Sequence, residues 1–324
     1  MLYPLVFEPI LQHRIWGGRS LETLYGKNLP PGSQIGESWE ISDRPDAVSI
    51  ISNGSLAGKS LRWLMENHLV ELMGKAEALN GRFPLLIKIL DAREKLSLQV
   101  HPPARLAAEL NGEPKTEMWY FAQAEPDAEI FAGLKAGVTE PDFTTKTHDG
   151  TVADCFHRIP VRQGDAMFLP SGRVHALGQG MVIFEIQQNS DTTYRVFDWN
   201  RIDSEGKTRD LHIEQSLRCI DFEDVEPSLV QVDEPLEVNG VRISTLVDHQ
   251  VFRVDLVEAQ TSATLQYSLD RPLVVGVVTG NASIQFGGEQ IDLSTGKFSL
   301  IPPNLPQVDL IVNAQSRLLL ASPR

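Results

Sequence analysis

The chain has 324 residues, of which 42% are hydrophobic and 22% are charged, as is ordinary for a globular protein. This length exceeds what one average domain needs, so it favours two domains or one core with additions. The formal net charge of -14 argues against partners such as nucleic acid or an anionic membrane.

The acidic balance also sets a condition on any phosphorylated ligand, which would need a local cluster of Lys and Arg. The chain contains only two cysteines, Cys155 and Cys219, so a disulfide framework is excluded and a reducing compartment fits. The N-terminal segment MLYPLVFEPI lacks a basic region and contains Pro4, Glu8 and Pro9, so we do not expect a signal peptide. A cytoplasmic location is the expectation.

In chain order, the first clear element is a helix that begins after Ser60, a favourable N-cap. Residues with helical spacing on one face follow it and predict a helix over 61–72: Leu61, Leu64, Met65, His68, Leu69 and Leu72. We interpret His68 as a semi-buried residue of this face and not as a ligand. Shorter helical segments are predicted at 104–110, 141–156 and 210–219.

Most other segments predict strands, because they are short, β-branched and bounded by Gly, Pro, Asn or Asp. The predicted strands lie at 83–90, 96–100, 118–122, 166–170, 181–187, 251–257, 272–278 and 283–286. Many short strands with such punctuation are typical of jelly rolls and barrels. We therefore expect a mainly β protein with two jelly-roll β-barrel domains and a few helices in or near the first.

A weak internal repeat supports two β domains. The segment GDAMFLP at 164–170 is followed five residues later by His175, and GKFSLIP at 296–302 is followed five residues later by Gln307. The repeat indicates two copies of one hairpin, one of which has lost its histidine. The acidic, proline-containing stretch 221–235 is interpreted as the approach to the second domain, which places the domains at 1–234 and 235–324.

Side-chain alternation gives two of the predicted strands a polar face backed by an apolar one. In the first, Ser97, Gln99 and His101 share one face, while Leu96, Leu98 and Val100 share the other. In the second, Lys115, Glu117 and Trp119 share one face, while Met118 and Tyr120 share the other. In a barrel the polar face lines the interior and the apolar face packs outward.

Two imidazoles and a carboxylate, from His101, Glu117 and His175, match the ligand preferences of a catalytic zinc ion, and Gln99 adds a carbonyl oxygen. Taken singly, each residue has an ordinary alternative. His101 can end a strand before Pro102, Glu117 can be a surface charge, and His175 can be a loop histidine. Spacing alone is weak evidence, because these residues are far apart in the sequence.

Several segments together resemble the type I phosphomannose isomerases in their short bacterial form. They are FPLLIKILDAREKLSLQVHP, KTEMWY, GDAMFLPSGRVHALG and EIQQNSDTTYRVFDWNR, with RIWGG and IGESWEIS near the N-terminus. The resemblance extends over the whole chain. It implies a pair of cupin barrels, with a metal in the first and a degenerate second, in agreement with the repeat.

The resemblance also implies an activity, the interconversion of mannose 6-phosphate and fructose 6-phosphate through a cis-enediolate. It implies one Zn²⁺ per chain, held by Gln99, His101, Glu117 and His175, and a catalytic role for Arg195. The expected partner is a small-molecule sugar phosphate, bound by a monomer or weak homo-oligomer. The predicted substrate-binding residues are Lys88, Lys115, Ser97 and Glu185.

The residues leave several roles open. Lys88 can be a snorkelling lysine of an edge strand, and Lys115 can form a surface ion pair with Glu117. The base that moves the C2 proton can be Glu185, Asp191, a metal-bound water or a lysine of depressed pKa. Arg201 and Lys207 can belong to a phosphate site or to a solvated loop. Trp119 and Tyr194 can stack on a sugar or pack in the core.

Three rival functions follow from the same pattern. The first is a non-catalytic cupin that binds a sugar phosphate, which the intact candidate ligand set and Arg195 disfavour. The second is an iron-dependent cupin oxygenase, which a second His in place of Gln99 would favour. The third is an isomerase that prefers another sugar.

Overall fold

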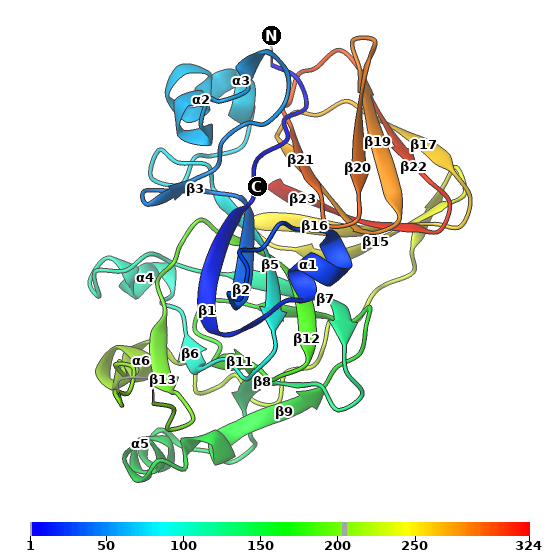
Figure 1. Ribbon diagram of the computed structural model, residues 1–324. Coiled ribbons are helices and arrows are strands. Elements are labelled where there is room, and N and C mark those ends of the chain that lie inside the picture. Colours follow the sequence, from blue (N-terminus) through cyan, green and yellow to red (C-terminus); the bar gives the residue numbers. More distant parts are fainter. Residues whose placement is uncertain (1, 203–205) are drawn as a thin grey trace.

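The structure, a computed structural model, describes residues 2–202 and 206–324 and contains two β-domains, each made of two sheets. Figure 1 shows the second domain, in yellow to red, above the first domain, in cyan to green. The blue N-terminal segment reaches the second domain, where Leu5 and Leu300 exchange backbone hydrogen bonds of 2.8 Å. The prediction of a mainly β, two-domain architecture is confirmed.

The first β-domain consists of a six-stranded sheet and a five-stranded sheet. The six-stranded sheet has the order β1 (Ile10–Gly18), β2 (Ile35–Ile41), β5 (Leu85–Ala92), β12 (Met181–Gln188), β7 (Glu117–Ala124), β10 (Ala166–Leu169). The five-stranded sheet has the order β13 (Tyr194–Phe197), β6 (Leu98–Val100), β11 (His175–Leu177), β8 (Glu129–Leu134), β9 (Phe156–Pro160). A small hairpin joins β3 (Asp43–Arg44) to β4 (Ala47–Val48).

The second β-domain repeats this plan. Its larger sheet has the order β14 (Leu236–Val238), β15 (Val241–Asp248), β16 (Phe252–Ala259), β23 (Ser316–Pro323), β18 (Leu273–Thr279), β21 (Phe298–Ile301). Its smaller sheet has the order β17 (Ala263–Tyr267), β22 (Val308–Val312), β19 (Asn281–Phe286), β20 (Glu289–Ser294).

The two halves of the sequence repeat occupy equivalent places in these sheets. β10 and β21 are both end strands of their sheets and pair with β7 and β18, respectively, and β21 also bridges the N-terminal segment at Leu5. Gly164 and Gly296 precede them with φ of +97° and +78°, a conformation that favours glycine. His175 opens β11 and Gln307 immediately precedes β22, so the histidine and its substitute stand at corresponding points of the two domains.

All eight predicted strand segments overlap observed strands, but the helix predicted over 61–72 is two helices, a correction. α2 (Leu61–Asn67) ends at His68, whose φ of −136° and ψ of 31° are not helical, and α3 (Leu69–Met73) follows. The break turns Leu69 outward, where it is 43% exposed, and lets Met73 be buried instead. Ser60 does cap α2, since its side chain accepts a hydrogen bond from the backbone N–H of Trp63.

The remaining helices are short and lie around the first domain. They are α1 (Ser20–Tyr25), α4 (Ala104–Ala107), α5 (Glu140–Asp149) and α6 (Ile213–Cys219), with 3-10 turns at Gly54–Leu56 and Val152–Cys155. Within the described ranges, no helix has the length and apolar character needed to cross a membrane.

The back of the first domain's larger sheet packs against the larger sheet of the second domain in one shared apolar core. Met118, Tyr120 and Phe184 from the first domain join Phe252 and Phe298 from the second in this core. The rings of Phe184 and Phe298 are 5.5 Å apart between centroids. The outward-facing apolar residues predicted for β7 therefore face another domain and not solvent.

Replacing Phe184 with Ala is expected to destabilise the protein by about 3–5 kcal/mol, because it opens a cavity at this shared core. Urea-induced unfolding, followed by tryptophan fluorescence, measures the change. Val70→Ala is the control, since Val70 is 75% exposed. Equal unfolding midpoints for the two variants would contradict the packing described here.

Candidate metal centre and active site

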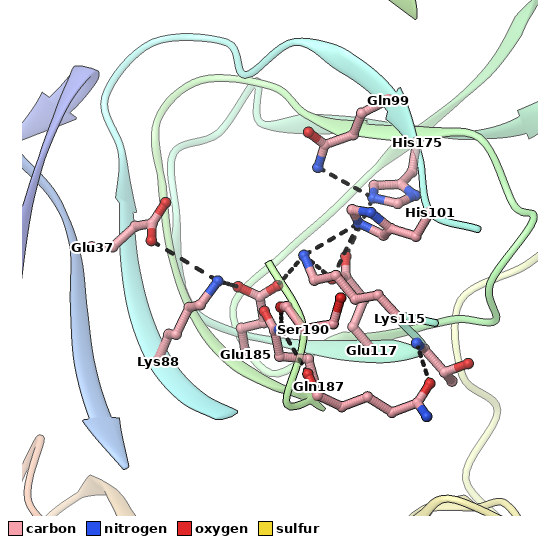
Figure 2. A network of polar contacts seen from close by, with 12 residues as sticks. Glu37, Lys88, Gln99, His101, Lys115, Glu117, His175, Glu185, Gln187 and Ser190 are labelled. Atoms are coloured by element: carbon pink, nitrogen blue, oxygen red, sulfur yellow. Dashed lines mark hydrogen bonds and ion pairs between the residues drawn. The ribbon is translucent and has the colours of Figure 1, made fainter. Parts of the chain in front are cut away.

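Four polar side chains predicted as metal ligands come from both sheets of the first β-domain. Glu117 opens β7 of the six-stranded sheet, whereas Gln99 of β6, His101 just after it and His175 of β11 belong to the five-stranded sheet. Figure 2 shows Gln99, His101 and His175 facing Glu117 and Lys115 across the interior. The site therefore lies between the two facing sheets.

The carboxylate of Glu117 lies between the two imidazoles. Its Oε2 is 3.5 Å from Nε2 of His101, and its Oε1 is 3.3 Å from Nε2 of His175. Two tetrahedral zinc ligands at 2.0–2.1 Å from the ion are about 3.3–3.4 Å apart. Among the described residues, these three side chains form a group whose potential ligand atoms all lie within 4.8 Å of one another.

The other ring nitrogen of each histidine is held by a backbone carbonyl. Nδ1 of His101 lies 2.8 Å from the carbonyl oxygen of Thr192, and Nδ1 of His175 lies 2.9 Å from that of Arg173. Carbonyl oxygens only accept, so each Nδ1 is the protonated nitrogen and donates. In the neutral ring, each Nε2 then keeps a lone pair directed at the site, as metal-binding histidines require.

The charges of the site also suit a cation. Burial by itself would raise the pKa of Glu117, but the charge of Lys115 outweighs it and holds that pKa well below its usual range. Burial, together with the charge of Lys115, lowers the pKa of His101 to about 3, so its ring is neutral. Neither carboxylate oxygen of Glu117 makes a well-directed hydrogen bond to any described residue, although both are buried. An ionised, buried carboxylate flanked by two imidazole rings fits a divalent metal ion.

Lys115 is a buried member of the site, so the alternative of a surface ion pair does not hold. It is only 4% exposed, and its Nζ lies 2.9 Å from Oε2 of Glu117 and 3.2 Å from Nε2 of His101. Burial acts to lower its pKa, but the carboxylates of Glu117 and Glu185 outweigh that effect and raise it. Lys115 is therefore a fixed cation.

Lys88 and Glu185 extend the charged lining away from the histidines. They are opposite each other in the β5–β12 ladder, and Nζ of Lys88 is 3.6 Å from Oε2 of Glu185. Lys88 also lies 3.9 Å from Oε2 of Glu37 and over the ring of Trp39, so it is an interior and not a snorkelling lysine. Burial, with help from the charge of Glu117, raises the pKa of Glu185 to about 7.

The ladder of the five-stranded sheet places Arg195 on the same face as two candidate ligands. Gln99 is opposite both His175 and Arg195, and directly opposed residues of antiparallel strands share a face. Nη1 of Arg195 donates to the carbonyl oxygen of Asp210 at 2.8 Å, while its Nε is buried without a partner among the described residues.

A local excess of positive charge lies beside Arg195. Asp198 pairs with both Arg201 and Arg209, and these charges act electrostatically on Arg195. Among the described residues, these three guanidinium groups thus face two carboxylates, those of Asp198 and Asp210. Although the chain as a whole is acidic, it has the local cluster of cations that a phosphorylated ligand would need.

The remaining predicted residues are placed less directly. Ser97 is buried just before β6. The amide nitrogen of Gln99, and not its carbonyl oxygen, lies toward the ring of His175, at 3.4 Å from Nε2. Trp119 packs edge-on against the ring of His175 inside the domain, and the hydroxyl of Tyr194 donates to the carbonyl oxygen of Leu110. Both aromatic residues therefore have core contacts.

Sequence reasoning missed Glu37 and the two backbone carbonyls that orient the histidines. Glu37 accepts hydrogen bonds from Arg14 and from the indole of Trp39 and approaches Lys88. Alternation in the segment IGESWEI of β2 gives Glu37 and Trp39 one face, which was a usable signal. The carbonyls of Thr192 and Arg173 had no such signal, because every residue carries one.

Fold and site together define a two-domain β protein with a buried His–Glu–His centre that can hold a metal. The family model described as "Phosphomannose isomerase type I, catalytic domain" matches residues 5–130. The mannose-6-phosphate isomerase ManA of Bacillus subtilis is 36% identical over 310 residues, which cover 95% of each chain. The mannose-6-phosphate isomerase of Streptococcus mutans is 38% identical over 93% of each chain.

The crystal structure of the mannose 6-phosphate isomerase from Bacillus subtilis agrees over the full length, with a TM-score of 0.89, 31% identity and 99% coverage of both chains. The chain belongs to the type I phosphomannose isomerase family. The prediction of an enzyme of the aldose–ketose isomerase class is confirmed.

Proposed function

We propose that this chain interconverts mannose 6-phosphate and fructose 6-phosphate with one zinc ion held by His101, Glu117, His175 and Gln99. The observation that carries the proposal is the buried carboxylate of Glu117, placed between two Nε2 atoms and free of well-directed hydrogen bonds from the described residues. The substrate is proposed from the names of the relatives. Two proteins named mannose-6-phosphate isomerase align with almost the entire chain.

The reaction moves a proton between C1 and C2 through a cis-enediolate, so negative charge develops on two adjacent oxygens. A bound zinc ion would supply Lewis-acid stabilisation of that charge. Arg195 is proposed as the catalytic residue that adds a rigid pair of donors toward the same oxygens. Its position opposite Gln99 in the ladder supports this role.

The other lining residues have distinct proposed tasks. Lys88, Lys115, Ser97 and Glu185 would bind and orient the sugar. The cluster of Arg195, Arg201 and Arg209 would attract the phosphate. Glu185 and Asp191 are the two carboxylates proposed to carry the proton between C1 and C2. Both are near the charged lining, since Glu185 lies 3.8 Å from Nζ of Lys115 and Asp191 also acts on that lysine electrostatically.

The test is formation of fructose 6-phosphate from mannose 6-phosphate by the purified protein, together with its metal content. We expect about one zinc per chain. Removal of zinc with a chelator should abolish turnover, and zinc, but not Mg²⁺, should restore it. Mannose without its phosphate serves as the matched control substrate and should react far more slowly.

Two results would count against the proposal. Turnover that persists in metal-free protein would remove zinc from the mechanism. A zinc-loaded protein that binds mannose 6-phosphate without converting it would favour the rival function of a non-catalytic sugar-phosphate-binding cupin.

A further inference from the structure

The end of β12 and the segment that follows it are anchored to the first domain by backbone hydrogen bonds and by a neighbouring side chain. The N–H of Gln188 donates to the carbonyl of Thr116, and the N–H of Asn189 donates to that of Pro84. The side-chain amide of Gln187 donates to the carbonyl of Ser190 at 2.6 Å, as Figure 2 shows. Ser190, which is fully buried, is therefore fixed in position.

Thr192, two residues further on, is held differently. In the described part of the chain, none of its hydrogen bonds joins backbone to backbone. Its N–H donates to the hydroxyl oxygen of Ser190 at 3.2 Å, and its own hydroxyl accepts from the N–H of Glu113 at 3.0 Å. Side-chain hydroxyl groups thus hold Thr192 on both its N–H and its side chain, next to the carbonyl that it presents.

These bonds form a closed ring. The hydroxyl of Ser190 donates to the carbonyl of Glu113 at 3.2 Å, while Glu113 donates to Thr192 and Thr192 donates back to Ser190. Arg44 fastens the ring from outside, because its Nη1 bonds the carbonyl of Asn189 and pairs with the carboxylate of Glu113. A closed ring with an external tie leaves the carbonyl of Thr192 little freedom.

That carbonyl accepts the Nδ1–H of His101 at 2.8 Å. The bond selects the tautomer and the ring orientation that direct Nε2 at Glu117. We infer that Ser190 is a positioning residue for His101, because its hydroxyl places the Thr192 carbonyl that orients the ring. The inference rests on the proposed role of His101 as a zinc ligand.

The other histidine shows why Ser190 matters for His101 in particular. His175 lies inside the β6–β11–β8 ladder, and the residue that supplies its carbonyl, Arg173, is fixed by a bidentate pair with Asp224. Among the described residues, His101 lies beyond the end of β6 and pairs with no strand, although its carbonyl accepts a hydrogen bond from the N–H of Gly172. Its orientation depends on the ring through Ser190.

The experiment measures the zinc affinity of the full-length, metal-free protein by competition with a chromophoric chelator. Ser190→Ala should bind zinc about 10–100-fold more weakly than the unaltered protein. Its His101 Nδ1–H resonance, seen by proton NMR, should weaken or disappear through exchange with water. Ser299→Ala is the matched control, since Ser299 is equally buried and also donates to a carbonyl, that of Leu5, but lies in the second domain.

A second pair of variants keeps the test decisive if Ser190→Ala does not fold. Thr192→Val removes the hydroxyl that accepts from Glu113 at nearly constant volume, whereas Thr192→Ser keeps it. The valine variant should lose zinc affinity and the serine variant should retain it.

The outcomes separate the two proposals. Unchanged zinc affinity in Ser190→Ala, or in Thr192→Val, would overturn the role of Ser190 while leaving the zinc site intact. Failure of the unaltered protein to bind zinc would overturn the zinc site itself, and the positioning role with it.

Discussion

His101→Ala and Glu117→Ala are expected to lose bound metal and isomerase activity together. Each removes one of three groups that converge within a few ångströms, and Glu117 also supplies the negative charge that a cation needs. If the ion contributes several kcal/mol to stabilising the developing charge, its loss lowers kcat/KM by about a thousandfold or more.

Metal content after dialysis and the rate of fructose 6-phosphate formation measure the two losses. His148→Ala is the matched control, because His148 is exposed on α5, outside the strands that carry the candidate ligands. A variant that keeps full zinc content but loses activity would show that the altered residue acts on the substrate and not as a ligand.

Arg195→Ala is expected to give the opposite pattern, with zinc retained and activity lost. The guanidinium group bonds the carbonyl of Asp210 and is not bonded to any candidate ligand, so its removal leaves the ligand set intact. Loss of one preorganised donor to a developing oxyanion lowers kcat by about 10²–10³-fold. The same assays of metal content and turnover apply.

Two further variants sharpen this prediction. Arg195→Lys keeps the charge without the paired donors, so it should recover only part of the lost rate. Arg218→Ala, which breaks an exposed ion pair with Glu109, should behave like the unaltered protein. Full activity of Arg195→Ala would remove this residue from the catalytic mechanism.

Local side-chain patterns predicted the parts of the site that lie along single strands. Alternation alone gives Lys115, Glu117 and Trp119 a common face, and the structure places all three inside the first domain. The register between strands cannot be predicted in this way. His175 and Arg195 both oppose Gln99 because strands far apart in the sequence pair with one another. From the sequence, only the resemblance to a family indicated that these residues belong to one site.

The helix predicted over 61–72 shows a different limit. Its apolar spacing continues through His68, but the chain turns there and exposes Leu69. Burial against the rest of the molecule, and not the local period, determined which residues face inward. The backbone carbonyls of Thr192 and Arg173 were equally out of reach, since their role depends on which ring comes to lie beside them.

The shared core between the domains bears on how the two copies of the repeat have diverged. The strand that carries Glu117 and Trp119 on its inner side presents Met118 and Tyr120 to the neighbouring copy. The second domain, which holds none of the candidate ligands, thus packs against the back of the sheet that carries Glu117. The second domain can therefore lose polar groups, such as the histidine that Gln307 replaces, without loss of this packing. It must, however, keep an apolar surface that matches the first domain in shape.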